Sequence, residues 1–195
     1  MYCIIITGVP ASGKTTLAHY LSQILHIPMV SKDEMKEILF DTVGFDNRKE
    51  KVKLGVGSTK LLYYFAGRMM QAKQDFILEN NFEKSDEDDL KQLFEKSKYQ
   101  CLTLKLTGDL FTIYERYVKR EFHPSRHRGH IVNDHYPTNE KIFPCPSSFE
   151  DYQKGIQHRG MDDFNGVGKI VEIDVTHLES LDYQEIAVNI KAQLE

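Results

Sequence analysis

A glycine-rich segment near the start of the chain has the residue types and spacing of a phosphate-binding loop. Residues 8–15 read Gly-Val-Pro-Ala-Ser-Gly-Lys-Thr, between an apolar run at 2–7 and a segment with helical periodicity. Such a loop turns backbone N–H groups toward a phosphate, and the positive end of the following helix dipole adds to the attraction. A glycine turn with an exposed lysine is the alternative, and it explains the flanking strand and helix less well. The pattern predicts that ATP binds through Gly8, Pro10, Ala11, Ser12, Gly13, Lys14, Thr15 and Thr16.

Three side chains of this loop have separate expected roles. Lys14 should reach the β and γ phosphate oxygens, Thr15 should ligate the Mg²⁺ that bridges them, and Thr16 should donate a further hydrogen bond. The sequence has no Asn-Lys-x-Asp run for guanine recognition, and the Glu-Asn pair after the strand expected at 76–78 is a poor match for a motor-type ATPase. These features favour an ATP- and Mg²⁺-dependent kinase.

An aspartate after the second expected strand is the candidate for the acceptor side of the reaction. Asp33 follows the apolar pair at 29–30, and the carboxyl ends of parallel strands meet at one edge of a sheet. Asp33 could accept the proton of an acceptor hydroxyl, or orient that hydroxyl, during in-line transfer. A helix-capping role is the alternative, but Ser31 offers the better cap. The other residues expected to bind the acceptor are Lys36, Glu79, Asn81, Arg126, Arg128 and His130.

Four arginines form a basic cluster in a chain whose net charge is −4. Arg116 and Arg120 are four residues apart on one helix face, and Arg126 and Arg128 follow in a loop. Phosphoryl transfer spreads negative charge over the moving group, so cations that close over it stabilise the transition state. The pattern predicts a lid in which Arg116 and Arg120, together with Lys14, are catalytic and bind phosphate. The alternative is a solvated face paired with neighbouring glutamates.

Apolar periodicity predicts the elements that position these residues. Strands that alternate with helices indicate a parallel sheet with helices on both faces. The strands are expected at 2–7, 29–30, 76–78, 101–106 and 170–173, and the helices at 17–25, 31–39, 48–72, 90–94, 110–118, 147–159 and 186–194.

Two of these helices have apolar stripes that define their expected buried faces. Ile38 belongs to the stripe of the helix that Ser31 caps, and Leu61 to that of the long helix 48–72. The neighbouring Tyr63 and Tyr64 are expected in the core rather than around a ligand.

Length and composition predict the domain organisation and the location. A chain of 195 residues, 41% hydrophobic and 28% charged, suits a single domain at 1–195, with a lid and a loop-rich insertion at about 119–168. Apolar runs are too short to cross a bilayer, no signal peptide is recognisable, and the three cysteines are far apart in sequence. We therefore expect a cytoplasmic protein without membrane contact. The acidic net charge favours a small-molecule partner over nucleic acid, and the oligomeric state is not predicted.

The histidines between 123 and 135 lie close in sequence to Cys145, which raises the question of a zinc site. Zinc-clamped lids use cysteine pairs at close spacing, and this sequence has none. We expect these histidines to face substrate or solvent.

With these motifs in view, the chain resembles the small P-loop kinases grouped with zeta toxins, chloramphenicol phosphotransferase and the predicted AAA-type kinases of bacteria. The resemblance runs from 4 to about 130 and rests on the loop, on Ser-Lys-Asp-Glu at 31–34, on Leu-Glu-Asn-Asn-Phe at 78–82 and on the arginines of the lid. It implies a P-loop NTPase fold of the nucleoside monophosphate kinase type, with five strands in the order 2-3-1-4-5. It also implies that Asp33 is the base and that Arg116 and Arg120 bind phosphate.

The resemblance leaves the acceptor unidentified. Members of the group commonly have proline where Arg128 stands, and residues 131–168 match no part of the pattern. A polynucleotide 5′-kinase would share the loop, Asp33 and a basic residue at Lys36, although the acidic net charge weakens that alternative. A nucleotide-gated switch that hydrolyses ATP slowly is the other alternative, and it would lack an acceptor pocket.

Overall fold

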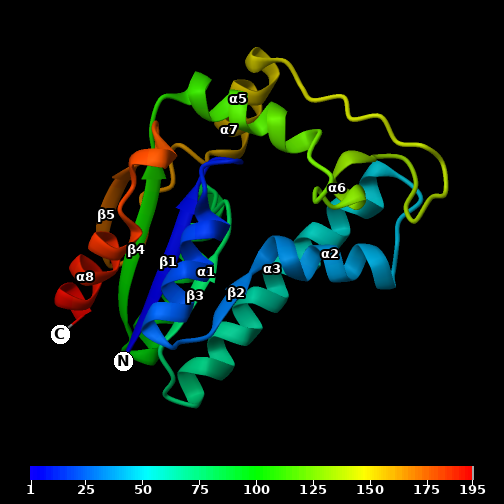
Figure 1. Cartoon of the computed structure of the whole chain (residues 1–195). Coiled ribbons are helices and arrows are strands. Elements are labelled where there is room, and N and C mark those ends of the chain that lie inside the picture. The colour runs from blue at the N-terminus through cyan, green and yellow to red at the C-terminus, as the bar shows by residue number, and fades with distance from the viewer. Residues whose placement is uncertain (195) are drawn as a thin grey trace.

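A computed structural model describes residues 1–194 and shows a parallel sheet between layers of helices (Figure 1). The strands are β1 (Tyr2–Gly8), β2 (Met29–Ser31), β3 (Phe76–Glu79), β4 (Gln100–Thr107) and β5 (Lys169–Asp174). The α-helices are α1 (Lys14–Leu25), α2 (Lys32–Thr42), α3 (Arg48–Gln71), α4 (Glu87–Ser97), α5 (Leu110–Glu121), α6 (Arg128–Ile131), α7 (Phe149–Arg159) and α8 (Tyr183–Leu194). Two single-turn 3-10 helices are η1 (Lys84–Asp86) and η2 (Leu178–Ser180). No helix within 1–194 is long and apolar enough to cross a membrane.

The five strands are all parallel and lie in the order β2-β3-β1-β4-β5, which confirms the order implied by the resemblance. The central strand β1 pairs Ile5 with Leu78 on one side and with Thr103 on the other. Because the strands run the same way, the residues that follow β1, β2 and β3 meet at one edge. In Figure 1, α5 and α7 lie above this edge, and α6 lies beside α2.

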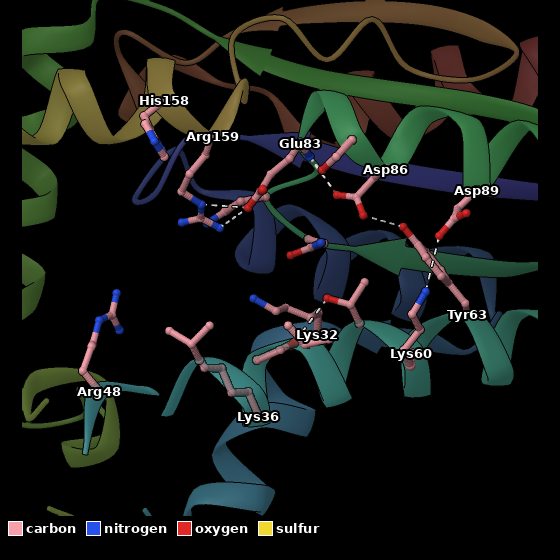
Figure 2. Close-up of a pocket in the computed structure, with 17 residues that line it drawn as sticks. Lys32, Lys36, Arg48, Lys60, Tyr63, Glu83, Asp86, Asp89, His158 and Arg159 are labelled. Carbon is pink, nitrogen blue, oxygen red and sulfur yellow. Dashed lines mark hydrogen bonds and ion pairs between the residues drawn. The ribbon is translucent and has the colours of Figure 1, made fainter. Parts of the chain in front are cut away.

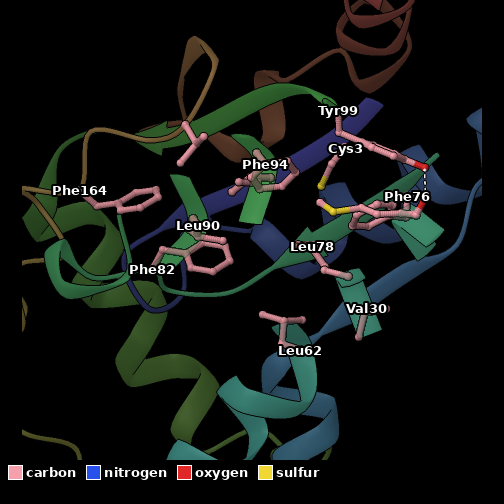
Figure 3. Close-up of a cluster of buried hydrophobic side chains, with 14 residues drawn as sticks. Cys3, Val30, Leu62, Phe76, Leu78, Phe82, Leu90, Phe94, Tyr99 and Phe164 are labelled. Atoms are coloured by element: carbon pink, nitrogen blue, oxygen red, sulfur yellow. Dashed lines mark hydrogen bonds between the residues drawn. The ribbon is translucent and has the colours of Figure 1, made fainter. Parts of the chain in front are cut away.

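Both faces of β1 are buried, as its uninterrupted apolar sequence predicts. Ile4 and Ile6 pack on one side with α1, α5 and α8. Cys3 and Ile5 pack on the other side with α3 and α4, in the cluster drawn in Figure 3. The helices on both faces therefore fix β1, and with it the start of the glycine-rich loop.

The buried faces of α2 and α3 differ from the predicted stripes. Ile38 and Leu61 are 62% and 44% exposed, whereas Phe40 and Leu62 are fully buried. Two adjacent stripes of a helix have the same four-residue spacing, so periodicity alone does not choose between them. Contact with the sheet selects the stripe of α3 that contains Ser58, Leu62, Ala66 and Met70.

The prediction for the two tyrosines of α3 is wrong for Tyr64 and holds in part for Tyr63, which packs against the core cluster. Tyr64 is largely exposed, and Tyr63 lines a cavity, where its hydroxyl donates a hydrogen bond to Asp86 Oδ1 at 2.7 Å. Tyr63 is one position past the buried Leu62 stripe, which turns its ring toward the segment after β3.

The segment between α5 and β5 contains two helices rather than the one predicted. In α7, the Tyr152 hydroxyl donates a hydrogen bond to Pro10 O at 2.7 Å, and Ile156 packs in a cluster with Val9. The chain then returns through Phe164, which is fully buried and stacks on Phe82 with 5.5 Å between ring centroids. The insertion is thereby anchored to the glycine-rich loop and to the core.

We predict that Phe164→Ala lowers the free energy of unfolding by about 3–5 kcal/mol, because it leaves a cavity beside Phe82. Urea unfolding followed by circular dichroism measures the loss. Phe143→Ala is the matched control, since Phe143 is 72% exposed, and it should change the stability by less than about 0.5 kcal/mol. Equal effects of the two substitutions would contradict the anchoring role of Phe164.

Candidate active site

The loop between β1 and α1 has the backbone of a phosphate cradle. Gly8 and Gly13 have φ angles of 149° and 91°, which favour glycine. A Cβ atom on Gly8 would lie 2.7 Å from Leu106 O and 2.8 Å from Ser12 Oγ, so the position has no room for a side chain. Helix α1 begins at Lys14, and its first N–H groups have no partner within the helix. The loop therefore offers backbone donors and a helix N-terminus to an anion.

Lys14 is buried inside this loop and satisfied by it. Its Nζ donates a hydrogen bond to Val9 O at 2.9 Å. Burial lowers the pKa of Lys14 to about 8, although the carboxylates of Glu79 and Asp33 oppose the shift. Thr15, the expected Mg²⁺ ligand, is exposed next to it. Besides the bond to Val9 O, the ammonium group makes a long contact of 3.5 Å to Ser12 Oγ, so weak interactions oppose its movement to a phosphate.

Ser31 links the ends of β2 and β3 and leaves Asp33 free of a structural role. Its hydroxyl donates a hydrogen bond to Glu79 Oε2 at 2.6 Å and accepts a long one from Glu34 N at 3.5 Å. Ser31 is thus the cap of α2, as predicted. Burial raises the pKa of Glu79, while Lys14 and Ser31 oppose that shift.

The Asp33 side chain is 46% exposed and surrounded by positive charge, with Lys32 Nζ 3.5 Å from Oδ1. Burial alone would raise the pKa of Asp33, but the charges of Lys32, His130, Lys36 and Lys14 outweigh it and hold that pKa well below its usual value. Asp33 is therefore ionised at neutral pH and only a weak base. Such a carboxylate can orient a hydroxyl group firmly and take its proton late in a transfer.

Two of the expected lid arginines lie in this group of charges. Arg120 is within electrostatic range of Asp33 and Lys14, because Asp33 raises the pKa of Arg120 and Arg120 lowers the pKa of Lys14. Burial is the main influence on Arg120, and it lowers the pKa. The buried Glu121 holds both arginines, at 2.9 Å from Arg126 Nε and 3.6 Å from Arg120 Nη2. The Arg126 contact is an ion pair whose angles are poor for a hydrogen bond.

The other two arginines lie elsewhere. Arg116 Nη1 donates to Thr176 O at 3.3 Å, next to the loop after β5, and its Nε and Nη2 are buried with no hydrogen-bond partner within residues 1–194. Arg128 is exposed, and its Nη2 donates to Glu140 O at 2.8 Å. The structure thus places Arg120 within range of Asp33 and holds Arg126 beside Arg120 through Glu121, whereas Arg116 and Arg128 have their contacts elsewhere.

Helix α6 is fixed to α2 and α3 by buried polar contacts. Lys51 of α3 is 3% exposed, and its Nζ donates to His130 O at 2.8 Å, to Val132 O and to Asn133 Oδ1 at 3.1 Å. The His130 ring contacts Glu37 Oε1 through Nε2 at 2.9 Å. These contacts hold His130 near Asp33. Two further histidines attach this segment to α2 and to the loop after it: His127 contacts Asp41 at 3.2 Å, and His135 contacts Asp46 at 2.8 Å.

A cavity of about 660 Å³ lies between α2 and α3 on one side and the segment after β3 with the end of α7 on the other (Figure 2). It includes Lys36 and Asn81, both predicted to bind an acceptor, and Lys32, which pairs with Asp33. The full lining is Lys32, Lys36, Arg48, Val52, Gly55, Val56, Thr59, Lys60, Tyr63, Asn80, Asn81, Glu83, Ser85, Asp86, Asp89, His158 and Arg159.

Several residues of this site were not predicted from the sequence. Arg48, Arg159 and Tyr63 line the cavity, and Glu121 holds the lid arginines. No local motif marks Arg48 or Arg159, since each reaches the cavity through the packing of a helix. Glu121 is one of the neighbouring glutamates considered as partners of the helix arginines, and it does pair with Arg120, but it is buried rather than on a solvated face.

A model of the AAA domain family matches residues 3–134. The chain belongs to this family. The matched part includes the glycine-rich loop, Asp33, Glu79 and the lid arginines, whereas α7 and β5 lie beyond it. No curated protein sequence matches the chain.

Solved structures resemble this family member over nearly its whole length. A "putative kinase" from Chloroflexus aurantiacus has a TM-score of 0.81 and 27% identity, and the match covers 100% of this chain and 98% of that one. A gluconokinase from Sinorhizobium meliloti has a TM-score of 0.52 and 15% identity, and the match covers 100% of this chain and 98% of that one. A shikimate kinase from Bacteroides thetaiotaomicron has a TM-score of 0.53 and 14% identity, and the match covers 99% of this chain and 97% of that one. The chain therefore has the P-loop kinase fold, and the narrower likeness to zeta toxins and chloramphenicol phosphotransferase stays a prediction.

We predict that nucleotide affinity is nearly constant below pH 8 and falls above it, by up to about tenfold per pH unit. The free protein loses the Lys14 charge as the pH rises through about 8, so binding of phosphate must restore a proton. Calorimetry with a nonhydrolysable ATP analogue and Mg²⁺ at pH 9, in two buffers of different ionisation enthalpy, measures this uptake. Lys36→Gln should retain this proton uptake. If the wild type takes up no proton on binding at pH 9, Lys14 is not the group that regains its charge.

Proposed function

We propose that the protein is an ATP-dependent phosphotransferase that moves the γ-phosphoryl group to a hydroxyl of a small-molecule acceptor. The observation that carries this proposal is the cluster of Lys14, Asp33 and Arg120 beside a cavity large enough for an acceptor. The likeness to structures named as kinases supports it. A nucleotide-gated switch, in which ATP binding only moves the lid, would not need such a cavity.

The residues of the loop and the lid fit a bound nucleotide. The Gly8 cradle has no room for a side chain, and the buried guanidinium atoms of Arg116 have no partner within 1–194. We infer that residues 8–16 hold the phosphates, that Thr15 ligates Mg²⁺ and that Arg116 binds the nucleotide near Thr176. When bound, ATP supplies the phosphoryl group and Mg²⁺ neutralises part of its charge.

The chain's own side chains then position and stabilise the transfer. Asp33 accepts a hydrogen bond from the acceptor hydroxyl and directs the hydroxyl oxygen at the phosphorus. It takes the hydroxyl proton as the new O–P bond forms and the bond from phosphorus to the leaving ADP breaks. Lys14 and Arg120 stabilise the charge on the transferred group, and Glu121 keeps Arg120 and Arg126 in place. Arg126 adds positive charge next to Arg120, whereas burial lowers the pKa of His130, so its ring is neutral at pH 7. We place this reaction in the cytoplasm. We expect the acceptor to be a small molecule rather than nucleic acid, because the net charge of −4 disfavours binding to a polyanion.

We predict that Asp33→Asn lowers kcat by about 10²–10⁴-fold and changes nucleotide affinity by less than about threefold, because it removes the proton acceptor and leaves the loop intact. Lys14→Ala should instead abolish nucleotide binding. The test is ³¹P NMR of ATP with a panel of hydroxylated small molecules, which separates phosphomonoester from inorganic phosphate. Transfer by Asp33→Asn at the wild-type rate would remove Asp33 from the mechanism, and inorganic phosphate as the sole product with every acceptor would favour a switch.

We predict that Arg120→Gln lowers kcat by about 10²–10³-fold, since it removes a cation that acts on the transition state. Lys119→Gln is the matched control, because Lys119 is the adjacent residue of α5 and is exposed. It removes the same charge from the same helix and should leave kcat unchanged. Similar losses in both variants would show that the net charge of α5 matters, rather than the position of Arg120.

A further inference from the structure

The wall of the cavity formed by α2 and α3 has more positive charge than the neighbouring carboxylates neutralise. Lys36 and Arg48 both line the cavity, and within residues 1–194 neither makes a hydrogen bond or an ion pair. Lys36 is half-buried against Gly55, where a Cβ atom would lie 3.6 Å from its Nζ, and its ammonium lies 5.3 Å from the centroid of the Phe40 ring. Figure 2 shows both cations on the same side of the cavity.

The acidic residues of the opposite wall offset these two cations only in part, because two of the three carboxylates are already paired with other cations. Glu83 pairs with Arg159, and Asp89 lies 3.4 Å from Lys60 Nζ. Asp86 accepts hydrogen bonds from the Tyr63 hydroxyl at 2.7 Å and from Glu83 N at 2.9 Å. Asp86 has no cationic partner within residues 1–194 and offsets one of the two charges, so a net positive charge remains at Lys36 and Arg48.

Holding Lys36 in this position costs free energy in the unliganded protein. A half-buried ammonium group loses hydration, and neighbouring cations repel it. Both effects are visible in its pKa, which burial and the charges of Lys32 and Arg48 lower to about 8. An anion bound between Lys36 and Arg48 would remove the cost and restore the full charge of Lys36.

We propose that this cavity binds the acceptor through a carboxylate or phosphate group held by Lys36 and Arg48, so that the acceptor is a small hydroxylated anion. The inference rests on the proposed function. Lys36 follows Asp33 by three residues on α2, and side chains at this spacing lie on one helix face with about 5–6 Å between Cβ atoms. An acceptor with a few carbon atoms between its hydroxyl and its anionic group can therefore reach both Asp33 and Lys36.

Three matched three-carbon probes test this inference in the intact protein. Glycerol, glycerate and glycerol 3-phosphate share a carbon skeleton and differ in having no anion, a carboxylate or a phosphate. Their affinities are measured by NMR from the methyl groups of Val52 and Val56, which line the cavity. We expect at least one of the two anions to bind tenfold more tightly than glycerol, and the tighter of the two identifies the anionic group.

Variants assign the binding to the two cations. Lys36→Gln and Arg48→Gln should each weaken the preferred anion at least fivefold, and Lys49→Gln, an exposed neighbour of Arg48 outside the cavity, should not. Because Arg48 is exposed, its substitution tests the inference even where Lys36→Gln impairs folding. Equal affinity for all three probes, or undiminished anion binding in both variants, overturns the inference.

The binding assay needs no turnover, so failure of the proposed function is distinguishable from failure of this inference. Anion binding at Lys36 and Arg48 with no acceptor-dependent release of ADP would count against a kinase and support the anion site. Efficient phosphorylation of neutral polyols in preference to their anionic counterparts would support a kinase and overturn the anion site.

Discussion

Positive charge collected at the carboxyl ends of β1, β2 and β3 is the constraint on which the rest of the structure depends. Lys14, Lys32, Lys36 and Arg120 act on one another's pKa values or on that of Asp33, so they share one electrostatic environment. Like charges held together in a partly desolvated site cost free energy unless anions join them. Nucleotide phosphates and an anionic acceptor would supply those anions, which makes substrate binding and charge neutralisation the same event.

The segment between α5 and β5 appears in the sequence as a loop-rich insertion, yet its contacts hold the site in place. Tyr152 attaches α7 to the glycine-rich loop, Phe164 attaches the returning chain to the core, and Lys51 fixes the end of α6 to α3. Arg159 at the end of α7 completes a wall of the cavity. The insertion is therefore part of the site, and differences in this segment would alter the acceptor more readily than differences in the sheet.

Local patterns predicted most of the fold, and long-range packing explains what they missed. The strands and their order followed from apolar runs and from the resemblance, because a buried parallel strand is recognisable from its own residues. The prediction of the buried face of α3 was wrong by one position, because Leu61 and Leu62 belong to neighbouring stripes with the same spacing. The observed stripe, extended seven residues back from Ser58, contains Lys51, so the correct register would have indicated a buried lysine. Arg48 had no such signal, because it joins the site through the packing of α3.

A crystal structure with a nonhydrolysable ATP analogue and Mg²⁺ tests the central claim most directly. The account predicts that Lys14 Nζ leaves Val9 O for the β and γ phosphates, that Arg120 contacts the γ-phosphate, and that the cavity beside Asp33 stays open to an acceptor. A nucleotide whose γ-phosphate lies away from both Asp33 and Arg120, with Lys14 still on Val9 O, would contradict the account.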